Sequence, residues 1–448
     1  MRPRSMMANR QGQRVAWRKV TSGRTGRNTL FGSAWQVLRL AIQLATVTIL
    51  ARTLGPYAYG TFAGYTGLGI VLAGLTSLGT GTLLIRNVAR DASSFGRHWY
   101  AMLKLSLVVT IMLLVAYVVI APRALNAPLP TSGIICLGLA ELLFYPLVYC
   151  ASFAFQAFER IGWATAIATS TAGFRLLGAL AFAVQPSHWG IQAYCFIYLF
   201  ASAMGGVFAI CAAAVVLKPP AARRGWIFHR HEIKTGLVYC MPVFTANGMV
   251  ELDKILAVRF SGPANSAVYT IAYRAMSALA TPVSILAIAV QPKLFRVTGR
   301  EHAAQRRRLV ALILASTVAL GILGGFAMVL GGYALPWLLG PAFAELKSAM
   351  ALLSPLPVLY CLRMIMGTIL TTEGGQRARA LLEGIALLVM VLLASLAMPG
   401  HGLGGIAVTI IGTEFLLLCG LSVAVAARWK HSRPSGLPAS YTEDTGQP

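Results

Sequence analysis

The sequence of 448 residues is poor in charge, and above all in acidic residues. Only 11% of its residues are charged, and thirteen Asp and Glu stand against thirty-eight Lys and Arg. Because a soluble globular protein has about 25% charged residues, this composition excludes that class. Apolar residues make up 57% of the chain and gather in runs long enough to cross a bilayer. The sequence therefore predicts a polytopic membrane protein, and its net charge of +25 does not indicate a nucleic-acid partner.

Several motifs of other protein classes are also missing. The seven cysteines form no CxxC pair, and no His stands at metal-ligand spacing, so we expect neither a disulfide framework nor a metal site. No GxxxxGK[ST] sequence is present, which argues against ATP-driven transport within this chain. The basic N-terminal segment lacks a small-residue cleavage site, so we expect no cleaved signal peptide. The loops are too short for a folded catalytic domain, and a secondary transporter, not an enzyme, is predicted.

Twelve apolar segments are long enough to span a bilayer, which takes about 20 residues of helix. They lie at residues 30–52, 59–84, 99–121, 131–156, 163–184, 190–217, 236–258, 266–291, 309–331, 348–371, 379–398 and 403–427. Twenty-eight Lys and Arg fall in the tails and loops on the side of the termini, and four fall in the loops of the other side. Because cytoplasmic loops carry the excess of Lys and Arg, both termini are predicted to lie in the cytoplasm.

An internal repeat indicates how the spans are grouped. Residues 49–56 read ILARTLGP and residues 255–263 read ILAVRFSGP, nearly half the chain apart. Parallel repeats of six spans predict two lobes around a central cavity. The alternative is that Gly-Pro merely ends a helix at each place. The predicted organisation is a basic cytoplasmic tail at 1–28, an N-lobe at 29–217, a basic cytoplasmic linker at 218–235, a C-lobe at 236–427 and a cytoplasmic tail at 428–448.

Three segments resemble a known family of transporters. They read TVTILARTLGPYAYGTFAGYTGLGIVLAGLTSLGTGTLLIRNVARD, VELDKILAVRFSGPANSAVYTIAYRAMSALATPVSILAIAVQPKLFR and, at residues 336–345, PWLLGPAFAE. These segments are similar to the oligosaccharide flippases of the polysaccharide transporter family, within the multidrug/oligosaccharidyl-lipid/polysaccharide exporter superfamily. The resemblance covers residues 28–425, and it implies a two-lobed all-α transporter of twelve or fourteen helices, of which this chain fits the twelve-helix type.

The resemblance also implies a function and a location. The expected substrate is an undecaprenyl-diphosphate-linked oligosaccharide unit, moved from the cytoplasmic to the outer leaflet of a bacterial inner membrane by alternating access, for O-antigen, capsule or exopolysaccharide. An ion gradient, not a cofactor, is expected to drive it. Membrane lipids and the polymerase and chain-length proteins of the same pathway are the further expected partners. Two alternatives remain open, a cation-coupled multidrug exporter of the same superfamily and an integral-membrane polysaccharide ligase.

Polar side chains inside spans are costly in lipid and commonly face a cavity. On several spans they recur at steps of three and four residues, which places them on one face of a helix. The predicted polar lining of the cavity consists of Gln36, Gln43, Tyr145, Asn247 and Ser277.

Four arginines within the spans are candidate ligands for the substrate diphosphate, because Arg pairs bidentately with phosphate oxygens as Lys does not. They are Arg39, Arg274, Arg363 and Arg175. The alternative is that these arginines pair with Glu141, Glu251, Asp253 or Glu414 and hold helices together.

Two acids within spans are candidates for ion coupling, Glu141 first and Glu414 second. A carboxyl group in a low-dielectric cavity can exchange protons near neutral pH. Asp253 and Lys254 stand where the related family commonly has an Asp followed by a basic residue. The resemblance therefore implies that these two residues form a conformational lock near the outer end of the seventh span.

Overall fold

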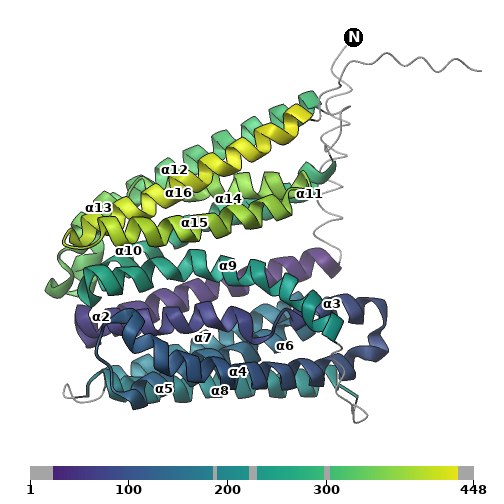
Figure 1. Cartoon of the computed structure of the whole chain (residues 1–448), viewed down its shortest axis with the longest axis horizontal. Coiled ribbons are helices and arrows are strands. Elements are labelled where there is room, and N and C mark those ends of the chain that lie inside the picture. Colours follow the sequence, from purple (N-terminus) through teal and green to yellow (C-terminus); the bar gives the residue numbers. More distant parts are fainter. Residues whose placement is uncertain (1–23, 185–188, 221–229, 297–302, 432–448) are drawn as a thin grey trace, which may run out of the picture.

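The computed structural model describes residues 24–184, 189–220, 230–296 and 303–431, and this part of the chain is helical with no strand (Figure 1). The first half contains α2 (Arg24–Thr76), α3 (Thr80–Arg90), η1 (Ala92–Ser94), α4 (Phe95–Leu125), α5 (Thr131–Leu139), η2 (Ala140–Phe144), α6 (Tyr145–Ala157), α7 (Ile161–Ala183) and α8 (Ile191–Leu217). The second half contains α9 (Arg230–Ser261), α10 (Pro263–Leu279), α11 (Thr281–Arg296), α12 (Ala303–Leu339), η3 (Pro341–Phe343), α13 (Leu346–Leu352), α14 (Leu356–Thr372), α15 (Gln376–Ala397) and α16 (Gly402–His431). The predicted all-α class is confirmed.

The number of membrane spans is not settled by helix length and composition. Among the described residues, eight helices are long and apolar enough to cross a membrane, or nine if a bent pair at the α13–α14 junction forms one span. One of the eight, Ala34–Arg90, contains two of the predicted spans. The seventh and eighth predicted spans fall on α9, α10 and α11, which carry polar residues and are not among the eight. The count of twelve therefore stays a prediction.

The two Gly-Pro sequences of the repeat have the same backbone conformation. Gly55 has φ 74° and ψ 171°, and Gly262 has φ 86° and ψ 160°. This region is open essentially to glycine alone, and the proline that follows is suited to begin the next helix. Gly55 thus breaks α2 into two helices, as Gly262 separates α9 from α10. Gly340, which precedes Pro341 outside the repeat, adopts φ 100° and ψ 170°, so the same device also ends α12.

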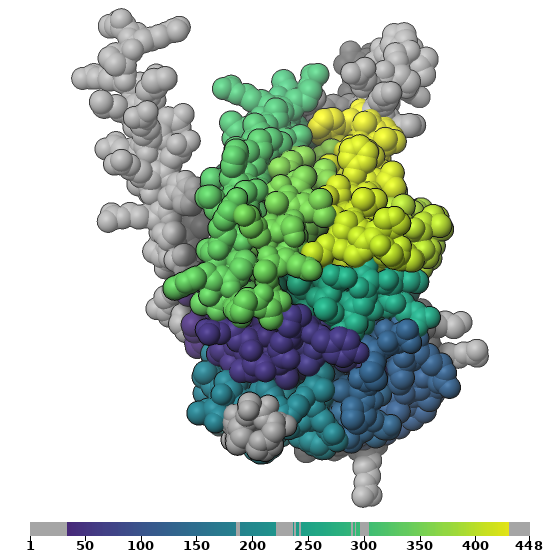
Figure 2. All heavy atoms as spheres, turned by 90° about the vertical axis from the view of Figure 1, so that its left-hand side faces the viewer, coloured from purple at the N-terminus to yellow at the C-terminus, as the bar shows by residue number. Residues whose placement is uncertain are grey.

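The helices form two groups, which we call the N-lobe (α2–α8) and the C-lobe (α9–α16). Figure 1 shows α9 and α10 next to α2, between the remaining helices of the two lobes. In Figure 2 the teal atoms of α9 and α10 likewise lie between the purple α2 and the yellow α16. Toward the end of the molecule where α9 begins, α12 and α16 slope away from α2 (Figure 1). At the end that the charge pattern assigns to the cytoplasm, α12 and α16 therefore diverge from the N-lobe, while the start of α9 stays in contact with it through Gly236 and Gly79.

Small residues bring the lobes together along the second part of α2. A Cβ atom added at Gly67 would lie 3.3 Å from a carboxylate oxygen of Glu251 in α9, and one at Gly74 would lie 3.2 Å from the backbone of Phe244. Helices in a membrane approach closely where such residues face each other. The glycines that contact the C-lobe in this way are Gly60, Gly64, Gly67 and Gly74.

Candidate functional site

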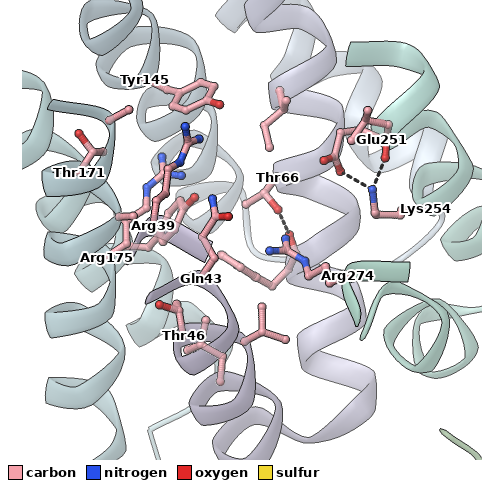
Figure 3. Close-up of a pocket in the computed structure, with 18 of the residues that line it drawn as sticks. Arg39, Gln43, Thr46, Thr66, Tyr145, Thr171, Arg175, Glu251, Lys254 and Arg274 are labelled. Carbon is pink, nitrogen blue, oxygen red and sulfur yellow. Dashed lines mark hydrogen bonds and ion pairs between the residues drawn. The ribbon is translucent and has the colours of Figure 1, made fainter. Parts of the chain in front are cut away.

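A cavity of about 430 Å³ lies between the lobes and is lined by residues of α2, α6, α7, α8, α9 and α10 (Figure 3). It brings together residues that are far apart in sequence. The predicted site residues that line it are Arg39, Gln43, Tyr145, Arg175, Asn247, Lys254, Arg274 and Ser277. Those that are not part of its lining are Gln36, Glu141, Asp253, Arg363 and Glu414. Gln36 is exposed on α2, one turn before Arg39.

Four cationic side chains and one carboxylate, that of Glu251, line this cavity. Two of the cations, Arg39 and Arg274, have no carboxylate oxygen within 4.0 Å in the described part of the chain. The Nε of Arg274 is buried and lacks a hydrogen-bond partner among the described residues. The lining therefore carries an excess of positive charge, to which the two arginines outside any ion pair contribute.

Arg175 lines the same cavity but is neutralised by Glu141. Its Nη2 lies 3.1 Å from Oε1 of Glu141, and its Nε donates a hydrogen bond of 3.1 Å to Ser202 in α8. The guanidinium carbon also stands 4.5 Å from the ring centroid of Tyr198, whose hydroxyl donates to Glu141. For Arg175, the structure therefore shows the ion pair that the sequence analysis gives as the alternative. Its guanidinium is held in place by contacts among three helices.

Glu141 is completely buried behind this pair. It belongs to the π-helical turn Ala140–Phe144, an irregularity that is frequent at functional sites. Gly69 of α2 packs against it so closely that an added Cβ would lie 2.7 Å from the Cβ of Glu141. Its second oxygen, Oε2, has no hydrogen-bond partner among the described residues. This oxygen therefore has a free lone pair at which a proton can bind.

The structure places Arg363 differently from the prediction that groups it with Arg39 and Arg274. Arg363 of α14 is not in the cavity lining, and its Nε lies 2.5 Å from Oε2 of Glu414 in α16. The two side chains are 12% and 5% exposed. Glu414 thus matches the charge of Arg363 within the C-lobe, and the structure does not bring Arg363 together with Arg39 and Arg274.

Asp253 and Lys254 form a buried network between α9 and α10. Asp253 accepts hydrogen bonds from the backbone N–H of Lys254, at 2.7 Å, and from the hydroxyl of Tyr269. The Lys254 ammonium lies 3.2 Å from a Glu251 oxygen and 4.6 Å from the ring centroid of Tyr273. Lys254 thus reaches the cavity with its charge balanced, and the lock that we predict for this pair remains a prediction.

The sequence patterns missed most of the aromatic lining. Tyr59, Tyr194, Tyr198 and Tyr273 line the cavity together with Glu251. Each tyrosine lies in a strongly apolar stretch, so periodicity alone did not single it out. One feature of the sequence could have indicated these residues. A tyrosine within a predicted span needs a polar partner for its hydroxyl when it is buried, so it is a candidate for the polar interior.

The sequence profile of a family described as "Polysaccharide biosynthesis protein" matches residues 25–298. The chain belongs to this family. No curated protein matches the sequence.

Solved structures show the fold. An inward-facing multidrug resistance MATE family transporter of the MOP superfamily superposes with a TM-score of 0.72 at 15% identity, over 89% of this chain and 99% of that one. The lipid II flippase MurJ in an inward closed conformation superposes with a TM-score of 0.65 at 11% identity, over 90% of each chain. An outward-facing MATE transporter superposes with a TM-score of 0.60 at 16% identity, over 92% of this chain and 98% of the other. The predicted two-lobed membrane fold is confirmed.

Proposed function

We propose that the protein moves undecaprenyl-diphosphate-linked oligosaccharide units from the cytoplasmic to the outer leaflet by alternating access. The observation that carries this proposal is that Arg39 and Arg274 line one cavity from opposite lobes, with no carboxylate partner among the described residues. A diphosphate that leaves water needs its charge matched, and guanidinium groups match phosphate oxygens with paired hydrogen bonds. Membership of the polysaccharide biosynthesis family supports the sugar-bearing class of substrate.

The conformation of the structure is consistent with the step of alternating access in which substrate enters from the cytoplasm. At the end assigned to the cytoplasm, α12 and α16 slope away from α2 (Figure 1), although α9 remains in contact with the N-lobe there through Gly236 and Gly79. Near the other end, Gly60 lies directly against the backbone of Pro263. The better superposition on an inward-facing than on an outward-facing MATE transporter agrees with this description. A head group would enter this conformation from the cytoplasmic side.

The coupling ion in this proposal is a proton, and the first candidate to bind it is Glu141, with Glu414 as the second candidate. Each carboxylate is buried against an arginine of its own lobe, Arg175 or Arg363. Protonation of Glu141 removes the negative charge that balances Arg175, and the freed guanidinium adds to the positive potential in the cavity. An ion gradient can thereby change how strongly the cavity holds an anion.

A multidrug exporter is the second candidate, because MATE transporters share this fold. The charge of the cavity argues against it for cationic drugs, since the unpaired Arg39 and Arg274 repel cations in a medium of low dielectric constant.

The two functions are separated by reconstitution. Purified protein in liposomes should move undecaprenyl-diphosphate-linked N-acetylglucosamine between leaflets, measured by access of an external galactosyltransferase to the sugar, and should not accumulate ethidium under a proton gradient. Ethidium accumulation without movement of the lipid would favour the exporter.

A further inference from the structure

A second, smaller pocket of about 180 Å³ adjoins the cavity. It lies among α2, α3, α6 and α9, and it shares the side chains of Tyr145, Tyr149 and Asn247 with the larger cavity. The pocket and the cavity are therefore direct neighbours within the protein. We call it the aromatic pocket, because four of its lining residues are Tyr145, Tyr149, Phe153 and Tyr239.

Three of these rings form a ladder along α6. Tyr145 and Tyr149 lie edge to face with ring centroids 4.9 Å apart, and their hydroxyls are 3.0 Å apart. The Tyr149 and Phe153 centroids are 6.4 Å apart, and Gly81 of α3 packs directly against the Phe153 ring. Tyr149 is 44% exposed. The ladder is thus fixed from behind while the ring of Tyr149 remains accessible.

Polar groups with free hydrogen-bonding capacity surround the ladder. Ser77 and Thr82 line the pocket, and their hydroxyls have no hydrogen-bond partner among the described residues. Asn247 donates from Nδ2 to the Ile70 carbonyl at 3.1 Å, which leaves its Oδ1 for a ligand. Aromatic faces for C–H surfaces, together with a few polar groups at the rim, suit a sugar ring, which has both kinds of surface.

A groove of about 60 Å³ between α2 and α10 is lined by Leu40, Gln43, Leu44, Arg274, Ser277 and Ala278. It shares Gln43, Arg274 and Ser277 with the cavity and no residue with the aromatic pocket. Neither Arg39 nor Arg274 lines the aromatic pocket. A diphosphate bound at these two arginines therefore leaves the aromatic pocket free for another part of the substrate.

We propose that the aromatic pocket binds the pyranose ring attached to the diphosphate, with the ring stacked on Tyr149 and its hydroxyls bonded to Asn247, Ser77 and Thr82. This inference rests on the proposed function and adds a sugar subsite to it. The aromatic pocket has room for one sugar ring. The protein therefore recognises the first sugar, and the remaining sugars of the unit lie in the larger cavity.

The test is equilibrium binding by the full chain in lipid nanodiscs. The probes are undecaprenyl diphosphate without sugar and the same lipid carrying N-acetylglucosamine or galactose. We expect the parent protein to bind both sugar-bearing lipids about tenfold more tightly than the sugarless lipid, which is the scale of one good aromatic contact. Tyr149→Ala should remove this preference and leave the affinity for the sugarless lipid unchanged, whereas Tyr149→Phe should retain it.

Two further variants keep the test decisive. Tyr239→Ala opens the same pocket from α9 and should also reduce the preference, even if Tyr149→Ala does not fold. Tyr57→Ala is the matched control, since Tyr57 is 53% exposed and lines neither the cavity nor the pocket. No sugar preference in the parent protein, or equal losses for all three lipids in Tyr149→Ala, would overturn the subsite.

The same measurement separates this inference from the proposed function. If the parent protein binds the sugarless lipid and Arg39→Gln with Arg274→Gln abolishes that binding, the diphosphate site stands even where the sugar preference fails. If the parent protein binds none of the three lipids, the proposed function and the subsite fail together.

Discussion

The guanidinium of Arg175 and the carboxylate of Glu141 lie 3.1 Å apart at the wall of the cavity, where the acid is fully buried and the arginine is 16% exposed. This arrangement puts a proton-binding group directly behind a cavity cation. In the proposed mechanism, protonation of Glu141 would change the charge that the cavity presents to an anion, although the anion does not touch this residue. Arg39 and Arg274 have no carboxylate oxygen within 4.0 Å in the described part of the chain.

The first prediction concerns Glu141→Gln. The amide keeps the shape and can still accept from Tyr198, but it cannot titrate. We expect normal insertion and a transport rate that no longer responds to an imposed proton gradient in proteoliposomes. Glu345→Gln, at an exposed position, is the control and should respond like the parent protein. A gradient response equal to the parent's would show that Glu141 serves only to pack helices.

A second prediction concerns the pair of Arg363 and Glu414. Removal of one partner leaves a buried charge uncompensated, so Arg363→Met alone should lower the free energy of unfolding by about 3–5 kcal/mol. The combined variant Arg363→Met with Glu414→Leu replaces the pair by apolar side chains and should recover most of that loss. Thermal unfolding in detergent measures both. A single variant as stable as the parent protein would contradict the buried ion pair.

The third prediction concerns the contact between Gly60 and Pro263. A Cβ atom at Gly60 would overlap the backbone carbonyl of Pro263, which cannot move aside as a flexible side chain would. Gly60→Ala should therefore destabilise this conformation relative to one with the lobes apart at that end, by about 1–3 kcal/mol. Ala267, one turn after Pro263 on α10, is completely buried. Labelling of a cysteine introduced at Ala267 by a membrane-impermeant maleimide should become faster.

Gly384→Ala is the control for this experiment, because nothing lies within 4 Å of a Cβ atom at that position. It should leave the labelling rate at Ala267→Cys unchanged. An unchanged rate in Gly60→Ala would mean that this contact does not hold the lobes closed.

A fourth prediction tests orientation, which rests on the excess of Lys and Arg in one set of loops. A reporter fused after His431 should be active only in a form that works in the cytoplasm. A reporter inserted near Asn126, between α4 and α5, should be active only in a form that works after export. The reverse pattern would overturn the direction of transport.

Much of the molecule could be predicted from local sequence. Apolar runs predicted the helices, and the spacing of Arg39 with Gln43 and of Arg274 with Ser277 predicted that these residues face one cavity. Pairing of a span arginine with an acid was one of the two alternatives, but the choice of Glu414 as the partner of Arg363 could not be predicted, because it depends on how α14 and α16 pack. The aromatic pocket could not be predicted either, because its lining residues come from both lobes.

The last prediction asks whether the two unpaired arginines serve the diphosphate or the fold. Arg39→Lys and Arg274→Lys keep the charge and most of the length but lose the planar fork that grips two phosphate oxygens. Since neither arginine has a carboxylate within 4.0 Å among the described residues, the change breaks no ion pair in the protein. We therefore expect both variants to insert at the parent's level and to fail to restore surface polysaccharide in a strain that lacks the protein. Arg52→Lys, at an exposed position of α2, should restore it fully. Full restoration by the two cavity variants, or their loss from the membrane, would show that the arginines are structural.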